Sequence, residues 1–179
     1  DSPLYTTYNK IENLMDKNSF EAQLLHTPFD KGDAYHSLSM PVYNTAAYEF
    51  DTAEAMEEAF CGRTADHAYS RITNPTVQYF EKRIRTITGA LSVTALNSGM
   101  AAVSNVFITL ARSGANIVTS PHLFGNTYSF FKSTLAAFGV EVRFCDLTNP
   151  DEVRERVDEN TCAVFLEVIT NPQIEFADL

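Results

Sequence analysis

The sequence contains no tryptophan, only three cysteines in 179 residues, and no apolar run near the roughly 20 residues that a membrane-spanning helix needs. Cys61, Cys145 and Cys162 are odd in number and widely spaced, which argues against a disulfide framework and against a zinc knuckle. The four histidines lack metal-ligand spacing, and the glycines form no dinucleotide or phosphate-loop motif. We therefore expect free thiols in a reducing compartment, no metal site and no nucleotide cofactor.

Positive charge is also scarce, because 23 acidic residues outnumber 13 basic ones and give a net charge of −10. This balance disfavours a surface for nucleic acid or for anionic membranes, since few cations are available to neutralise phosphate groups. Any anion site must then be local. The first residues show no charged-then-apolar signal pattern, and the composition is otherwise that of a globular protein, so a cytoplasmic protein is expected.

From about residue 90 onward, short apolar runs alternate with amphipathic segments, which is typical of an α/β fold with a parallel sheet covered by helices. The expected strands cover residues 92–96, 116–120, 140–145 and 162–167. Helical stripes are expected at Met100, Val103, Phe107 and Leu110, with an end near Gly114, and at Tyr128, Phe131, Leu135 and Phe138, with an end at Gly139. A more exposed helix is expected over 151–159.

Residues 1–66 show only fragmentary periodicity, which predicts an extended N-terminal arm for subunit contacts rather than a second core. The elements expected here and just beyond are helices over 20–26 and 52–60, a loop over 32–44, and a helix with Val77, Phe80, Ile84 and Ile87 on one face that ends at Gly89. Such arms commonly reach a neighbouring subunit, so self-association is expected.

The tripeptide Ser98-Gly99-Met100 stands where a buried strand is expected to turn into a helix. The free amides and the macrodipole of a helix N-terminus attract phosphate, and a glycine leaves the backbone open to a ligand. Taken alone, the tripeptide is equally explained as a tight turn.

Tyr69 and Arg71 precede the helix entry Asn74-Pro75-Thr76. On the extended or loop segment expected here, residues two apart project on the same side, so a phenol and a guanidinium can converge on one anion. The alternative is an ordinary surface pair followed by a capped helix start. Together with the Ser98 tripeptide, the pair points to a phosphorylated cofactor.

Three stretches in combination resemble one family: YSRITNPT at 69–76, the Ser98-Gly99-Met100 tripeptide and EVITNP at 167–172. The chain is similar over about residues 20–179 to the N-terminal half of the Cys/Met-metabolism enzymes, which are fold-type I proteins that use pyridoxal 5′-phosphate. The resemblance implies pyridoxal phosphate as cofactor. It also implies that 67–179 form the first part of the cofactor-binding large domain, preceded by the arm over 1–66.

The resemblance further implies roles for individual residues. Tyr69 and Arg71 would bind the cofactor phosphate of the neighbouring subunit, so the active site would be shared within a dimer, itself expected to assemble into a homotetramer. Ser98, Gly99 and Met100 would meet the phosphate through backbone amides. Glu167 matches a motif carboxylate of the family and would belong to the cofactor-binding residues, and Asn171 matches the asparagine near the pyridine 3-hydroxyl.

Two departures from the family pattern stand out. Phe124, in LFGNTY, occupies the position that usually holds the tyrosine stacked on the cofactor ring, so stacking would survive while proton transfer would fall to another group such as Tyr69. An ordinary core aromatic is the alternative for Phe124. Lys132 is the only lysine after Lys82 and lacks the pattern around the family's Schiff-base lysine, so we expect an incomplete portion of an enzyme that is inactive by itself.

Within the family, LFGNTYSFF together with EVITNPQIEFADL is most similar to the O-acetylhomoserine sulfhydrylase group. That likeness implies γ-replacement in methionine biosynthesis, in which O-acetylhomoserine and sulfide, or a thiol, give homocysteine, or its thioether, and acetate. Methionine γ-lyase and cystathionine γ-synthase or lyase are the alternatives within the family. A non-catalytic fragment that only contacts another subunit is the alternative outside it.

Overall fold

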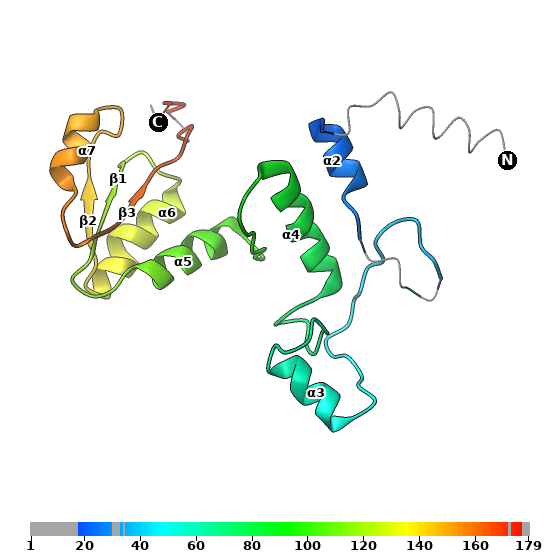
Figure 1. The fold of residues 1–179 in the computed structure, drawn as a ribbon. Coiled ribbons are helices and arrows are strands. Elements are labelled where there is room, and N and C mark those ends of the chain that lie inside the picture. Colours follow the sequence, from blue (N-terminus) through cyan, green and yellow to red (C-terminus); the bar gives the residue numbers. More distant parts are fainter. Residues whose placement is uncertain (1–17, 30–32, 34, 172, 177–179) are drawn as a thin grey trace. The chain divides into compact units, whose positions relative to one another are not determined.

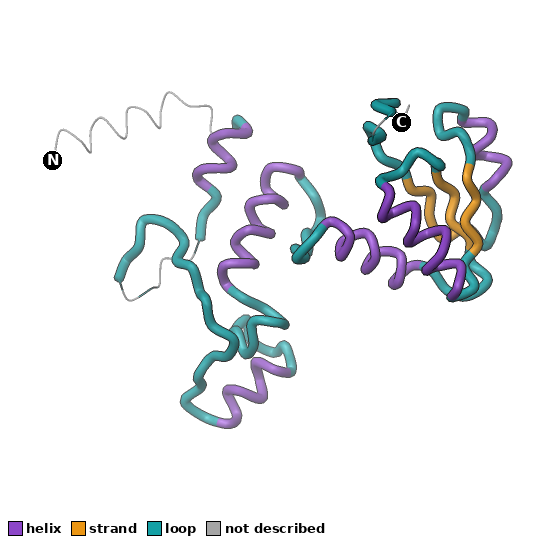
Figure 2. The backbone as a smooth tube through the Cα atoms, turned by 180° about the vertical axis from the view of Figure 1, so that it is seen from behind, coloured by secondary structure: helices purple, strands orange, loops and turns teal. Residues whose placement is uncertain are grey.

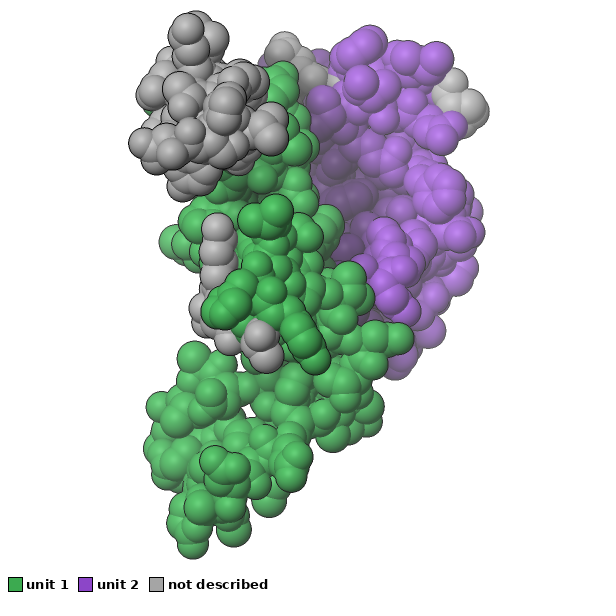
Figure 3. Space-filling model, turned by 90° about the vertical axis from the view of Figure 1, so that its right-hand side faces the viewer, with its two compact units in different colours: residues 1–95 green, residues 96–179 purple. Residues whose placement is uncertain are grey.

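The computed structural model describes residues 18–29, 33, 35–171 and 173–176. The chain divides into two compact units, residues 1–95 and 96–179, which are coloured separately in Figure 3. The predicted arm over 1–66 lies partly outside the described residues, and its boundary with a domain over 67–179 stays a prediction. No helix in the described part of the chain is long and apolar enough to cross a membrane.

The second unit contains a three-stranded parallel sheet in the order β2-β1-β3 (Figure 1). Its strands are β1 (Asn116–Thr119), β2 (Glu141–Phe144) and β3 (Thr161–Phe165). Every residue of β1 is buried, as expected for the central strand. Thr119 pairs with Phe144 on one side and with Phe165 on the other, so the carboxyl ends of all three strands meet at one edge. The three later predicted strands and the α/β class are thus confirmed.

The helices of this unit are α5 (Gly99–Leu110), α6 (Gly125–Ser129), the π-helical turn η1 (Phe130–Leu135) and α7 (Pro150–Arg156). Figure 2 shows the strands side by side with helices packed against them. Phe107, Phe131 and Phe165 meet edge to face, with ring centroids 4.6 to 5.4 Å apart, and join α5, η1 and β3. The apolar spacing correctly predicted a helical segment here but not its π-helical turn, because both backbones place similar residues on one face.

Three expectations for this region are wrong. Residues 92–96, all of them described, form no strand, because the segment finds no neighbouring backbone to pair with. The Ala95 amide instead donates to the Glu81 carboxylate at 2.7 Å. The helix expected to end near Gly114 ends at Leu110, and Phe138 of the predicted stripe is exposed.

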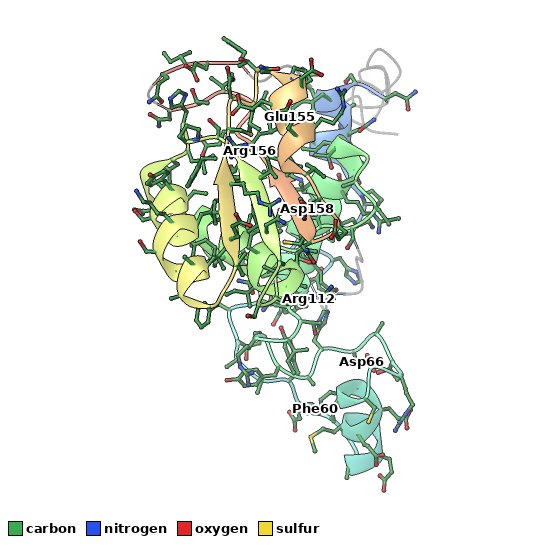
Figure 4. All side chains as sticks on the ribbon, turned by 90° about the vertical axis from the view of Figure 1, so that its left-hand side faces the viewer. Phe60, Asp66, Arg112, Glu155, Arg156 and Asp158 are labelled. Carbon is green, nitrogen blue, oxygen red and sulfur yellow. The ribbon has the colours of Figure 1, made fainter. Side chains whose placement is uncertain are left out.

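The loop after α7 replaces the last residues of the helix expected over 151–159. Asp158 accepts hydrogen bonds from Arg143 at 2.7 Å and from Asn116 at 2.8 Å, and Arg143 also donates to the Arg156 carbonyl. Arg156 and Asp158 are labelled in Figure 4. The bond from Arg143, followed by those from Asn116 and the Asn160 amide, lowers the pKa of Asp158 to about 2. The carboxylate is thus held outside the helix by the strands.

The first unit contains α2 (Phe20–His26), α3 (Ala53–Phe60) and α4 (Pro75–Thr88), as the sequence predicted. Helix α4 ends at Gly89, whose φ of 68° is in the left-handed region that favours glycine. Helices α2 and α4 pack together. Their contact includes hydrogen bonds from the Tyr79 hydroxyl to the Thr27 carbonyl and from Lys82 to the Pro28 carbonyl.

Candidate functional site

The N-terminus of α5 forms an open anion-binding turn. Ser98 is extended and caps the helix, since its Oγ accepts the Ala101 amide at 3.0 Å and its carbonyl accepts the Ala102 amide. Within the described residues, the amides of Gly99 and Met100 have no protein acceptor. A Cβ placed on Gly99 would meet nothing within 4 Å, so the backbone is approachable. Two free amides at the positive end of a 12-residue helix suit a phosphate.

The turn that begins α6 lies against this first turn of α5. The Thr127 hydroxyl, on a buried side chain, donates to the Met100 sulfur at 3.6 Å. Phe124 stands at the start of α6 with 48% of its surface exposed. The alternative that Phe124 is a core aromatic is therefore wrong, and its ring is available to stack on a ligand.

Glu167 reaches the same turn from the end of β3. Its carboxylate Oε1 accepts the Phe124 backbone amide at 2.8 Å. The neighbouring ends of β1 and β3 are tied by a hydrogen bond from Thr119 Oγ1 to the Phe165 carbonyl. One carboxylate oxygen of Glu167 therefore accepts a hydrogen bond from the protein backbone.

A cleft of about 290 Å³ opens at the carboxyl edge of the sheet, where ligands of open α/β sheets bind. Its lining includes His122, Asp146, Glu167, Thr170 and Glu175. His122 Nδ1 lies 2.5 Å from a Glu175 carboxylate oxygen. Bonds from the Thr148 hydroxyl and amide lower the pKa of Asp146, which favours its ionised form.

Asn171 lies in an exposed turn at this edge. The turn is closed by the pairing of Ile169 with Phe176, and the Glu175 amide donates to the Thr170 hydroxyl. Among the described residues, the Asn171 side chain has no hydrogen-bond partner, which leaves its amide free for a ligand. Its contact with a pyridine hydroxyl stays a prediction.

Tyr69 and Arg71 contact each other, whereas their convergence on one anion stays a prediction. The Arg71 guanidinium carbon lies 5.1 Å from the Tyr69 ring centroid, a cation–π contact. Of the extended and loop conformations expected for this segment, the structure has a turn, because the amides of Ile72 and Thr73 both donate to the Tyr69 carbonyl. Their predicted binding of a phosphate in a neighbouring subunit remains a prediction.

Asn74 organises this turn more extensively than its sequence context indicated. The side-chain oxygen of Asn74, Oδ1, accepts hydrogen bonds from the backbone amides of Thr76 and Val77 and so caps α4. The side-chain nitrogen of Asn74, Nδ2, lies within hydrogen-bond distance of the Tyr43 carbonyl, the Tyr48 hydroxyl and the Ser70 hydroxyl. The sequence indicates the cap at Asn74 but not its contacts with Tyr43, Tyr48 and Ser70. The role of Thr127 was not predicted either, although its position three residues after Phe124 could have indicated it.

The arrangement fits a phosphorylated aromatic cofactor. Amides at the helix terminus suit the phosphate, the exposed Phe124 ring suits a flat heterocycle, and Asn171 offers a free amide to a ring substituent. The individual contacts stay predictions.

The chain is similar to known proteins over most of its length. The family model described as Cys/Met metabolism PLP-dependent enzyme matches residues 21–179. The chain is 36% identical to an O-acetyl-L-homoserine sulfhydrylase of Corynebacterium glutamicum, over 92% of this chain and 38% of that protein. It is also 36% identical to an L-methionine gamma-lyase of Fusobacterium nucleatum, over 81% of this chain and 37% of that protein.

A solved structure from Campylobacter jejuni, described as an O-acetylhomoserine (thiol)-lyase, aligns with a TM-score of 0.82 at 34% identity. The alignment covers 89% of this chain and 39% of that one, and that structure carries a pyridoxyl-lysine phosphate. This chain thus spans less than two fifths of the length of these relatives. From the match over residues 21–179, the chain belongs to the pyridoxal-phosphate-dependent enzyme family of Cys/Met metabolism.

Proposed function

We propose that this chain carries the phosphate-binding region of an O-acetylhomoserine sulfhydrylase, which converts O-acetylhomoserine and sulfide to homocysteine and acetate. The junction of α5 and α6 carries the proposal, because Gly99 and Met100 offer two amides on α5, Thr127 of α6 contacts Met100, and the Phe124 ring is exposed at the start of α6. Support for the substrate comes from the Corynebacterium and Campylobacter relatives, whose names specify O-acetylhomoserine. A thiol in place of sulfide would give the corresponding thioether.

Pyridoxal phosphate supplies an electron sink that makes protons next to the substrate amine removable. In the proposed site, the amides of Gly99 and Met100 would hold the phosphate, Phe124 would stack on the ring, and Asn171 would bind the 3-hydroxyl. The γ-carbon of the substrate loses its bond to the acetate oxygen, which leaves with the electron pair, and gains a bond to sulfur. Phe124 has no hydroxyl to move a proton, so the Tyr69 phenol is the proposed proton carrier.

The site is proposed to be shared between two copies of the chain, with Tyr69 and Arg71 of one copy binding the phosphate held by the other. Both side chains are solvent-accessible and already face each other, which supports this role. Pairing of two such dimers into a homotetramer belongs to the same proposal. So does a cytoplasmic location, which suits the three free cysteines.

The Schiff-base lysine is proposed to lie outside these residues. Lys132, on η1, donates to the Tyr128 hydroxyl at 3.0 Å and lies over that ring, so its ammonium group is already engaged. We accordingly expect Lys132→Ala to retain cofactor binding, and we expect no activity from residues 1–179 alone.

Methionine γ-lyase is the second candidate, supported by the Fusobacterium relative. Elimination would release 2-oxobutyrate, ammonia and a thiol without any added sulfide. Phe124 in place of the family's usual tyrosine weighs against it.

The test begins with the intact mass and the visible absorption of the purified protein after incubation with pyridoxal phosphate. A visible band, with homocysteine formed only when O-acetylhomoserine and sulfide are both present, would support the sulfhydrylase. Formation of 2-oxobutyrate from methionine without sulfide would favour the lyase. A protein heavier than 20.0 kDa that gains no band would refute both, whereas a 20.0 kDa protein without a band would favour the non-catalytic fragment.

A further inference from the structure

The backbone at the start of α6 depends on a single side chain from another element. No side chain caps the helix at Phe124, and the Phe124 carbonyl already accepts the Tyr128 amide at 3.0 Å. The Phe124 amide donates to Glu167 at 2.8 Å, across 43 residues of sequence. With its carbonyl held by α6 and its amide held by Glu167 at the end of β3, the φ and ψ of Phe124 are restrained from both sides, and so is the direction of its Cα–Cβ bond, from which the ring projects.

We propose that Glu167 is a positioning residue, which sets the stacking orientation of the Phe124 ring by accepting the Phe124 backbone amide. This inference rests on the proposed function, since the ring's ligand is the cofactor. It assigns Glu167 a role through protein backbone, whereas the resemblance to the family predicted a place for Glu167 among the cofactor-binding residues.

Three features support a positioning role. First, the pairing of Thr119 with Phe165 fixes the end of β3 beside the segment that leads to Phe124, so Glu167 starts from a rigid strand end. Second, Thr127 anchors the next turn of α6 to Met100, so the bond from the Phe124 amide to Glu167 restrains the start of a turn that is already held further along. Third, an ionised acceptor makes a stronger bond to an amide than a neutral one does, which suits a bond exposed to solvent.

The two roles of Glu167 predict different effects of substitution. A glutamine keeps an oxygen that can accept the amide but removes the charge, whereas an alanine removes both. A positioning role therefore predicts that Glu167→Gln resembles the wild type and that Glu167→Ala does not. A direct electrostatic role toward the cofactor predicts that both variants are equally impaired. Asp146→Asn is the matched control, because it removes a carboxylate at the same edge whose bonds are local, to Thr148.

The first measurement is amide hydrogen exchange of the segment containing Phe124, in protein without cofactor. Loss of a charge-assisted bond should speed exchange of this amide about tenfold in Glu167→Ala. Glu167→Gln should change it less than threefold, and Asp146→Asn should leave it unchanged. Unchanged exchange in Glu167→Ala would overturn the proposal, whether or not the protein binds a cofactor.

The second measurement is the visible circular dichroism of bound pyridoxal phosphate together with its dissociation constant. We expect Glu167→Ala to lose most of the dichroic signal and to bind about tenfold more weakly, with Glu167→Gln near wild type. Equal impairment of both variants would overturn the proposal in favour of a direct charge effect. Failure of the wild-type protein to take up cofactor would instead refute the proposed function, and the exchange result would identify that case separately.

Discussion

Replacing Asn74 by alanine should destabilise the first unit more than the loss of an ordinary helix cap. Asn74 is buried, with 7% of its surface exposed. Its oxygen caps α4 through Thr76 and Val77, and its two amide hydrogens serve acceptors on Tyr43 and on two other residues of the surrounding turns. Loss of the cap costs about 1 kcal/mol. The side-chain amide of Asn74 can donate two hydrogen bonds at once, and their loss costs about 2 kcal/mol more. The expected total loss of stability is therefore about 3 kcal/mol.

Asn74→Asp separates these contributions, because a carboxylate still caps the helix but cannot donate. We expect it to cost about 2 kcal/mol, since only the donated bonds are lost. Thr52→Ala is the matched control for a simple cap, because Thr52 Oγ1 accepts the Ala55 amide at 3.1 Å on the exposed helix α3. It should cost about 1 kcal/mol.

Urea unfolding followed by far-ultraviolet circular dichroism measures all three values. The order expected is Asn74→Ala, then Asn74→Asp, then Thr52→Ala. If Asn74→Ala lowers the free energy of unfolding no more than Thr52→Ala does, the hydrogen bonds donated by Asn74 do not stabilise the unit and the reasoning is refuted. A harmless Asn74→Asp would show that the donated bonds contribute nothing.

Three further predictions follow from other parts of the structure. Phe131→Ala should cost about 3 to 5 kcal/mol in urea unfolding, because the ring is fully buried against Phe107; a cost below that of Phe131→Leu would contradict the packing. Arg71→Ala should weaken pyridoxal phosphate binding about 10- to 100-fold by titration, and wild-type affinity would remove Arg71 from the site. The lowered pKa of Asp158 contributes stability above its unfolded value of about 4, and that stability is lost as the pH falls toward about 2. Asp158→Asn should therefore show a weaker decline in melting temperature over that range, and an identical decline would exclude the Arg143 pair as its cause.

Local signals predicted most of the elements because those elements are stabilised locally. Asn74 and Gly89 bound α4, as their capping preferences indicate, and the apolar runs at β1, β2 and β3 coincide with observed strands. The strand expected over 92–96 failed because a strand requires a partner, and partners are not local information. The motif residues were recognised because short stretches resemble a family, not because their contacts could be derived.

The sequence by itself determined the α/β class, the capped helix at Ser98, the family and its cofactor, since these follow from periodicity, capping preference and motif similarity. Only the tertiary structure decided which groups meet. Glu167 reaches Phe124 because β1 and β3 are neighbours in the sheet, and Thr127 reaches Met100 because α6 packs on α5. Such contacts join residues 27 to 43 positions apart. They form only when burial of the shared core brings separate elements together, so no local pattern in the sequence contains them.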